Sequence, residues 1–123
     1  MVCSKINGIT FTKLKEITDE RGSVLHMLRS DSPDFEKFGE CYFSEILQGK
    51  VKAWKCHSIQ TQNLAVPVGT IKIVLVDLRI NSNSNGIIEE FIIGRPNSYY
   101  RLKIPPGVWY GFKCISEEKA LIA

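Results

Sequence analysis

Short apolar or alternating runs, separated by turn-forming residues, dominate the chain. Runs of about five to eight residues that are rich in Val, Ile, Tyr and Phe are typical of β-strands. Their regular spacing predicts an all-β sandwich or barrel. The predicted strands are Ile9–Phe11, Ser23–Leu28, Glu40–Leu47, Val51–His57, Leu64–Val68, Thr70–Leu78, Ile87–Ile93, Tyr99–Ile104, Tyr110–Ile115 and Lys119–Ala123.

Only one segment carries helix signals. Ser32 suits an N-cap, Pro33 suits a first helical position and Gly39 suits a helix end, which together predict one short helical turn between strands. The polar stretch of residues 81–86, Asn-Ser-Asn-Ser-Asn-Gly, lies between two apolar runs and predicts a hairpin loop.

The length and composition suit a single domain with one hydrophobic core. With 123 residues and 44% hydrophobic residues, we expect residues 1–123 to form a single domain. The net charge of +3 comes from 16 basic and 13 acidic residues that are scattered along the chain. Nucleic-acid binding favours a concentrated basic patch, so we expect no nucleic acid as a partner. A small phosphorylated ligand fits this charge balance.

Several features of the sequence bear on where in the cell the protein is found. Residues 1–8 contain no apolar segment of a signal peptide, and the longest apolar run, residues 73–76, is too short to cross a membrane. We therefore expect a cytoplasmic protein with no membrane partner, and reduced thiols at its four cysteines. Residues 120–123 predict a strand without a polar tail, where a natural domain would usually continue, so the chain is either a shortened form or one that ends abruptly.

Two segments have the spacing of the cupin sequence motifs. Between Gly49 and Gly69, the places that hold His, His and Glu in the first cupin motif are occupied by Lys55, His57 and Gln62. Residues 105–110, Pro-Pro-Gly-Val-Trp-Tyr, match the second motif with tyrosine in the histidine place. The motifs predict a cupin-type jelly-roll β-barrel with at most one or two short helical turns. Residues 55 and 57 share one face of a strand, which should point into the barrel.

The residues at the four cupin ligand positions do not suit a metal ion. The ammonium group of Lys55 repels a dication, and the amide of Gln62 supplies no negative charge. Among the four cupin ligand positions, only His57 then provides a good metal ligand. We expect neither a metal nor another cofactor, and a metal-dependent dioxygenase-type cupin is the weakest alternative.

The expected barrel mouth holds groups that can move a proton. An imidazole such as that of His57 is the usual base at neutral pH. Asp77 follows an inward-facing pattern along its strand and could orient His57 or hydrogen-bond Tyr110. Lys55 or the hydroxyl of Tyr110 could stabilise an enolate oxygen, and Tyr110 could protonate the opposite face of the carbon. These four residues are the catalytic candidates.

Segments across nearly the whole chain match one enzyme family in order and spacing. They are Asp19–Gly22 (D-E-R-G), the segment that ends at His57, Val76–Arg79 (V-D-L-R) and Ile104–Phe112 (I-P-P-G-V-W-Y-G-F). Together they resemble the dTDP-4-dehydrorhamnose 3,5-epimerases. The resemblance implies a metal-free cupin homodimer that inverts carbons of a nucleotide-linked 4-keto-6-deoxy sugar through enolates.

The resemblance also implies roles for individual residues. It places His57 on the base of the family, Asp77 on a pocket aspartate and Arg21 on an arginine that binds the nucleotide diphosphate. An arginine pairs with a diphosphate through charge-assisted, bidentate hydrogen bonds. The candidate substrate-binding residues are Arg21, Gln62, His26 and Ser44.

The chain departs from the family pattern at several positions. Gln62 stands where the family has a lysine, Tyr110 replaces a second pocket histidine, and Trp54 replaces the arginine before the base. The catalytic tyrosine of the family, and the aspartate that pairs with its base, lie in a part beyond Ala123. Three alternatives to a double epimerisation therefore stay open: a single epimerisation, a 3,4-ketoisomerisation, and a catalytically reduced cupin that binds a sugar nucleotide.

Overall fold

The computed structural model describes residues 4–123, so the predicted reduced thiol of Cys3 lies outside the described residues. Strands make up the regular structure in this range. Their bounds are β1 (Thr10–Lys13), β2 (Glu16–Asp19), β3 (Gly22–Leu25), β4 (Ser44–Ile46), β5 (Val51–Lys55), β6 (Gln62–Leu64), β7 (Thr70–Asp77), β8 (Ile88–Gly94), β9 (Tyr100–Ile104), β10 (Val108–Cys114) and β11 (Ala120–Ile122).

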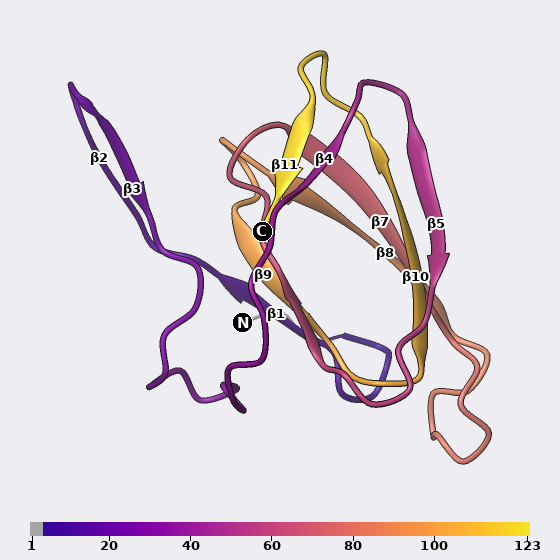
Figure 1. Cartoon of the computed structure of the whole chain (residues 1–123). Helices are drawn as coiled ribbons and strands as arrows, with labels where there is room; N and C mark the ends of the chain where they lie inside the picture. The colour runs from indigo at the N-terminus through magenta and orange to yellow at the C-terminus, as the bar shows by residue number, and fades with distance from the viewer. Residues whose placement is uncertain (1–3) are drawn as a thin grey trace.

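Two antiparallel sheets face each other and enclose the core (Figure 1). The larger sheet has the strand order β5-β10-β7-β8, and the smaller one has the order β1-β9-β6. Strands β4 and β11 form a pair beside them, and the β2–β3 hairpin projects away from the barrel. This arrangement confirms the all-β prediction.

Strand β7 is the central element of the larger sheet. Its side chains alternate between buried and half-buried positions along all of its residues, and Ile71, Ile73 and Leu75 are fully buried. Burying one such side chain contributes about 1.5–3 kcal/mol to stability. Phe11 of β1 stacks on Phe91 of β8 with ring centroids 4.4 Å apart, which joins the two sheets across the core.

The long connection between β3 and β4 contains no helix in this structure. Near the predicted helical turn, the amide of Phe35 donates to the carbonyl of Ser32 over 3.0 Å, which closes an isolated turn. The carboxylate of Asp34 instead fastens the connection to the smaller sheet. It accepts from Thr10 Oγ1 over 2.8 Å and from Arg101 Nη2 over 2.5 Å.

Most predicted strands match the observed ones with shifted ends. The predicted strand Leu64–Val68 shares only Leu64 with β6, and the sequence pattern does not predict β2. Residues 16–19 of β2 are half-buried or exposed, so they lack the alternation that marks the core strands. Strand β5 ends at Lys55, two residues before the predicted end at His57. The loop between β7 and β8 lies where the Asn/Ser/Gly stretch predicts it. No helix in residues 4–123 has the length and apolarity needed to cross a membrane.

Candidate active site

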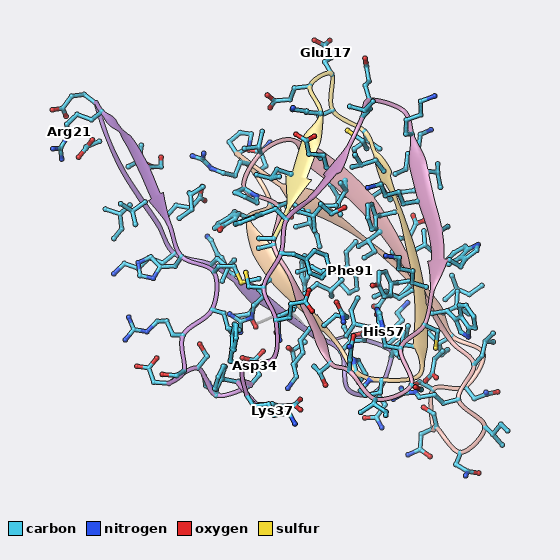
Figure 2. All side chains as sticks on the ribbon, in the orientation of Figure 1. Arg21, Asp34, Lys37, His57, Phe91 and Glu117 are labelled. Carbon is cyan, nitrogen blue, oxygen red and sulfur yellow. The ribbon has the colours of Figure 1, made fainter. Side chains whose placement is uncertain are left out.

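The two cupin-type motifs meet at one end of the barrel, where His57 lies (Figure 2). His57 follows β5, and its carbonyl oxygen accepts a hydrogen bond of 2.8 Å from the amide of Gly107, in the turn before β10. Its Nε2 atom lies 3.2 Å from the hydroxyl oxygen of Tyr110 on β10. The structure thus joins two of the catalytic candidates by a hydrogen bond.

The phenol of Tyr110 is buried inside the barrel. Tyr110 pairs with Leu75 of β7, and only 4% of its surface is exposed. Burial raises the pKa of Tyr110 to about 12, and the nearby phenol of Tyr42 adds to this rise. Tyr110 therefore keeps its proton at neutral pH and can donate it in a hydrogen bond, either to Nε2 of His57 or to an oxygen of a bound substrate.

The contact with His57 does not favour Tyr110 as the acid on the opposite face of the sugar. Two groups that contact opposite faces of one carbon atom are separated by more than a hydrogen-bond distance, whereas the polar atoms of His57 and Tyr110 lie 3.2 Å apart. An acid that completes an inversion must approach from the other side. The position of Tyr110 agrees better with its other expected role, a hydrogen bond to the enolate oxygen.

Tyr42 belongs to the same region, although the sequence did not point to it. Tyr42 is 53% exposed, and its phenol contributes to the raised pKa of Tyr110. Tyr42 comes from the irregular connection before β4, where no motif or alternation marks it. The one sequence signal for a role of Tyr42 is its position two residues before the candidate substrate-binding residue Ser44.

Lys55 and Gln62 both lie on barrel-facing positions of their strands. Lys55 is directly opposite Tyr110 in the β5–β10 pairing, so both side chains leave the sheet on the same face. Lys55 is nonetheless exposed, because β5 is the edge strand of the sheet. Gln62 is opposite the buried Ile104 and is half-buried, with a hydrogen bond of 3.3 Å from its amide to Gln60.

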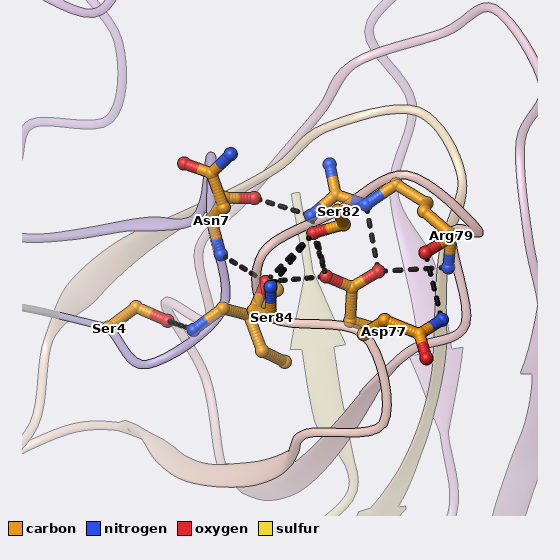
Figure 3. A network of polar contacts seen from close by, with 8 residues as sticks. Ser4, Asn7, Asp77, Arg79, Ser82 and Ser84 are labelled. Atoms are coloured by element: carbon orange, nitrogen blue, oxygen red, sulfur yellow. Dashed lines mark hydrogen bonds and ion pairs between the residues drawn. The ribbon is translucent and has the colours of Figure 1, made fainter.

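Asp77 is buried as predicted, but its partners differ from the expected ones (Figure 3). Its carboxylate accepts from Arg79 Nε over 2.8 Å and from Arg79 Nη2 over 2.9 Å. It also accepts from the hydroxyls of Ser82 and Ser84 over 2.7 and 2.5 Å. None of its hydrogen bonds within residues 4–123 goes to His57 or Tyr110.

These partners change the role of Asp77. The hydrogen bonds from Arg79 hold the pKa of the Asp77 carboxyl far below its usual range, against the opposing effect of burial. The backbone amide of Arg79 donates a fifth hydrogen bond to this carboxylate, over 3.0 Å. A carboxylate that is held in its charged form by five donors is a weak base. The prediction that Asp77 orients the His57 ring is wrong, because the turn after β7 occupies its oxygens.

Arg21 is not brought to His57 within one chain. It lies at the tip of the projecting β2–β3 hairpin, away from the barrel mouth (Figure 2). Its guanidinium is 82% exposed and pairs with Asp19 over 2.7 Å. The D-E-R-G motif therefore forms a hairpin turn. The guanidinium of Arg21 in this turn is accessible to a binding partner.

His26 and Ser44 lie outside the His57–Tyr110 pair. His26 lines a cavity of about 510 Å³ at the base of the hairpin, together with residues of β1 and the following connection. Its carbonyl accepts a hydrogen bond of 2.8 Å from the hydroxyl of Tyr99. The hydroxyl of Ser44 accepts a hydrogen bond of 3.1 Å from Lys52 on the neighbouring strand β5.

The donor set at the barrel mouth does not fit a metal ion. The structure places the phenol of Tyr110 beside His57, and the other two cupin ligand positions hold an ammonium group in Lys55 and an amide in Gln62. None of these supplies the carboxylate or second imidazole that a divalent ion favours. Among residues 4–123 no group of three or more His, Cys, Asp or Glu side chains could hold one.

Known proteins share both the sequence and the fold of the chain. A dTDP sugar isomerase from Desulfovibrio desulfuricans G20 has 48% sequence identity and a TM-score of 0.96, with 99% of this chain and 78% of that chain covered. The probable low-salt glycan biosynthesis epimerase Agl13 of Haloferax volcanii is 32% identical over 119 residues, which are 95% of this chain and 76% of that protein.

The fold extends to more distant enzymes. A dTDP-4-dehydrorhamnose 3,5-epimerase from Sulfolobus tokodaii has a TM-score of 0.80 and 25% identity, with 95% of this chain and 70% of that chain covered. No family model matches the chain.

Fold, motifs and relatives together define a cupin-type epimerase or isomerase of nucleotide-linked sugars. More narrowly, the chain belongs to the dTDP-4-dehydrorhamnose 3,5-epimerase family, which confirms the resemblance seen in its motifs.

The burial of Tyr110 predicts a pH dependence of stability at alkaline pH. Because its pKa rises from 10.0 to about 12 on folding, the folded state holds this proton more tightly than the unfolded state. The resulting stabilisation is complete below pH 10 and is lost as the pH rises through 12. We expect Tyr110→Phe to flatten the fall in unfolding free energy over this range by up to about 2–3 kcal/mol, measured by urea denaturation.

Phe112→Leu, on the same strand, is the matched control, since it removes packing but no titrating group. It should lower the free energy of unfolding equally at every pH in the series. A Tyr110→Phe protein whose free energy falls as steeply as that of the wild type would contradict the assignment.

Proposed function

We propose that the chain epimerises a nucleoside-diphosphate-linked 4-keto-6-deoxy sugar at a carbon next to the ketone, with His57 as the base. The observation that carries this proposal is the hydrogen bond of 3.2 Å between the His57 imidazole and the buried phenol of Tyr110. A base beside a group that can donate to an oxygen is the arrangement that enolate formation requires.

The proton and electron movements are simple. His57 removes the proton from the carbon next to the ketone, the C–H electron pair forms the carbon–carbon double bond, and the carbonyl oxygen becomes an enolate. When the ketone oxygen takes over the hydrogen bond of the Tyr110 hydroxyl, Nε2 of His57 becomes free to reach the carbon. Returning a proton to the other face of that carbon completes the inversion.

The proton for the other face comes from Tyr42 in this proposal. The phenol of Tyr42 contributes to the raised pKa of Tyr110, which supports a place near the barrel mouth, and its 53% exposure gives water access to it. It belongs to the connection before β4, whereas His57 and Tyr110 belong to the β5–β10 side of the mouth. We assign Tyr42 to the face of the sugar opposite His57 because the two side chains come from different segments of the chain.

Removing the base should abolish exchange at the carbon next to the ketone. Incubation of the wild-type protein with dTDP-4-keto-6-deoxyglucose in deuterated water should introduce deuterium there, detected by NMR. We expect His57→Ala to lower the rate of incorporation by at least about 100-fold, a loss typical for a general base. His26→Ala, the other histidine of the chain, should keep the proton-abstraction step. Incorporation by His57→Ala at the wild-type rate would refute the proposal.

Removing the phenol of Tyr42 should separate exchange from inversion. In Tyr42→Phe, His57 can still take the proton and return a deuteron to the same face, so labelled starting sugar should accumulate. We expect the inverted product to fall by about 10- to 100-fold while incorporation with retention persists. The exposed Phe43→Leu, the next residue, is the control. Equal loss of exchange and inversion in Tyr42→Phe would rule out this role.

Two other functions are outcomes of the same experiments. A 3,4-ketoisomerase would move the ketone along the ring, and the NMR spectrum of the product distinguishes this from inversion. The replacement of a second histidine by Lys55 counts against it. A catalytically reduced cupin would bind thymidine diphosphate in calorimetry and give no deuterium incorporation with any nucleotide sugar.

We also propose a homodimer in which the β2–β3 hairpin reaches a second copy of the chain. Ile17 and Val24 are directly opposite each other in the hairpin, and they are 48% and 59% exposed. A two-stranded hairpin with uncovered apolar side chains is marginally stable alone, which supports a covering partner. Arg21 at its tip would then meet the diphosphate in the site of that second copy.

Charges on the apolar face of the hairpin should disrupt this dimer. The double variant Ile17→Asp and Val24→Asp is expected to sediment as a monomer at micromolar concentration, whereas the wild type sediments as a dimer. Thr18→Asp and Ser23→Asp, the pair on the opposite face of the hairpin, is the matched control. A monomeric wild type, or a dimeric Ile17/Val24 variant, would contradict the proposal.

The cytoplasmic location and the assignment of residues 1–123 to one domain stay predictions. Reduced thiols are common in the cytoplasm, and Cys41, Cys56 and Cys114 are free in the structure. Cell fractionation tests the location, and the cooperativity of unfolding tests the single domain.

A further inference from the structure

Arg79 lies at a junction of three segments that are far apart in the sequence. Its guanidinium pairs with the buried Asp77 and also donates a hydrogen bond of 2.6 Å from Nη2 to the carbonyl of Asn7 (Figure 3). The side chain is 25% exposed, and the carboxylate that holds it is fully buried. These bonds fix the direction of the Arg79 side chain.

The methylene part of Arg79 supports the turn that precedes β10. A Cβ atom added to Gly107 would lie 2.9 Å from Cγ and 3.0 Å from Cδ of Arg79, so the turn rests directly on this side chain. Gly107 has φ of +88°, a conformation that favours glycine. Pro105, in the same turn, lies against Gly8, where an added Cβ would be 2.9 Å from Pro105 Cγ.

The same turn holds the candidate base. The amide of Gly107 donates the 2.8 Å hydrogen bond to the carbonyl of His57. Three residues later, the chain supplies Tyr110, whose hydroxyl lies 3.2 Å from Nε2 of His57. A contiguous series of contacts therefore leads from the buried Asp77 through Arg79 and Gly107 to both members of the His57–Tyr110 pair.

We propose that Arg79, fixed by Asp77, is a positioning residue that sets the place of His57 relative to Tyr110. The proposal rests on the assignment of His57 as the base. The proposal gives Asp77 an indirect role in the reaction. This role explains why a carboxylate is buried beside the site although its oxygens bind Arg79 and not His57 or Tyr110. A displacement of about 1 Å at a reacting group can lower a rate by about 100-fold.

The first test measures the place of His57 without any substrate. The chain has two histidines, so the Cε1–H signals of His57 and His26 can be assigned in a ¹H–¹³C NMR spectrum by single substitution. We expect Arg79→Ala to shift the His57 signal and to leave the His26 signal in place. Arg79→Lys keeps methylene groups against Gly107 and a charge for Asp77, so it should restore the wild-type position of the signal.

The second test measures the reaction. We expect Arg79→Ala to lower kcat by about 10- to 100-fold with KM within about threefold of the wild type, and Arg79→Lys to recover most of kcat. Ile93→Val, a core substitution on β8, is the control for stability. Its kcat should be unchanged. If Arg79→Ala does not fold, the double variant Asp77→Asn/Arg79→Ala removes the unpaired charge as well and takes its place.

Each outcome bears on the proposal. An unmoved His57 signal, or a kcat that falls as much in Ile93→Val as in Arg79→Ala, would overturn it. The deuterium incorporation of His57→Ala reports separately on the proposed function. If that incorporation persists while Arg79→Ala moves the His57 signal, His57 is positioned by Arg79 but is not the base.

Discussion

The ion pair between the buried Asp77 carboxylate and the partly exposed Arg79 guanidinium is the constraint on which the active-site end of the barrel depends. It closes the end of β7, the central strand of the larger sheet, and reaches both the segment before β1 and the turn before β10. Breaking such a pair on one side leaves an uncompensated charge, which costs about 3–5 kcal/mol. A buried charge with five donors therefore fixes one arrangement of three segments, which apolar packing alone specifies less sharply.

The alternation of apolar residues predicted most of the fold, because the core strands bury one face completely. Residues 70–77 alternate without exception, so both the strand and the inward direction of Asp77 could be read from the sequence. The motif spacing also brought His57 and Tyr110 together correctly. In both examples the signal is local: a period of two along a strand, or fixed positions around a turn.

Features that depend on contacts between distant segments could not be predicted in this way. Strand β2 is held by its hairpin partner rather than by the core, so it carries no apolar pattern. The contribution of Tyr42 to the raised pKa of Tyr110 depends on the path of an irregular connection. The carboxylate of Asp77 accepts hydrogen bonds from residues within seven positions of it in the chain. The local turn, rather than a residue of the barrel mouth, therefore occupies its oxygens.

The pairing of β1 with β9 and of β4 with β11 has a consequence for how the chain folds. Each pair joins a strand of the first half of the chain to one near its C-terminal end, so neither pair can form until most of the chain has been synthesised. The entropy of closing such long loops must be lost before the contacts form, which slows folding to about milliseconds or seconds. During that interval the apolar edges of half-formed sheets are open, and the nascent protein depends on dilution or chaperones to avoid aggregation.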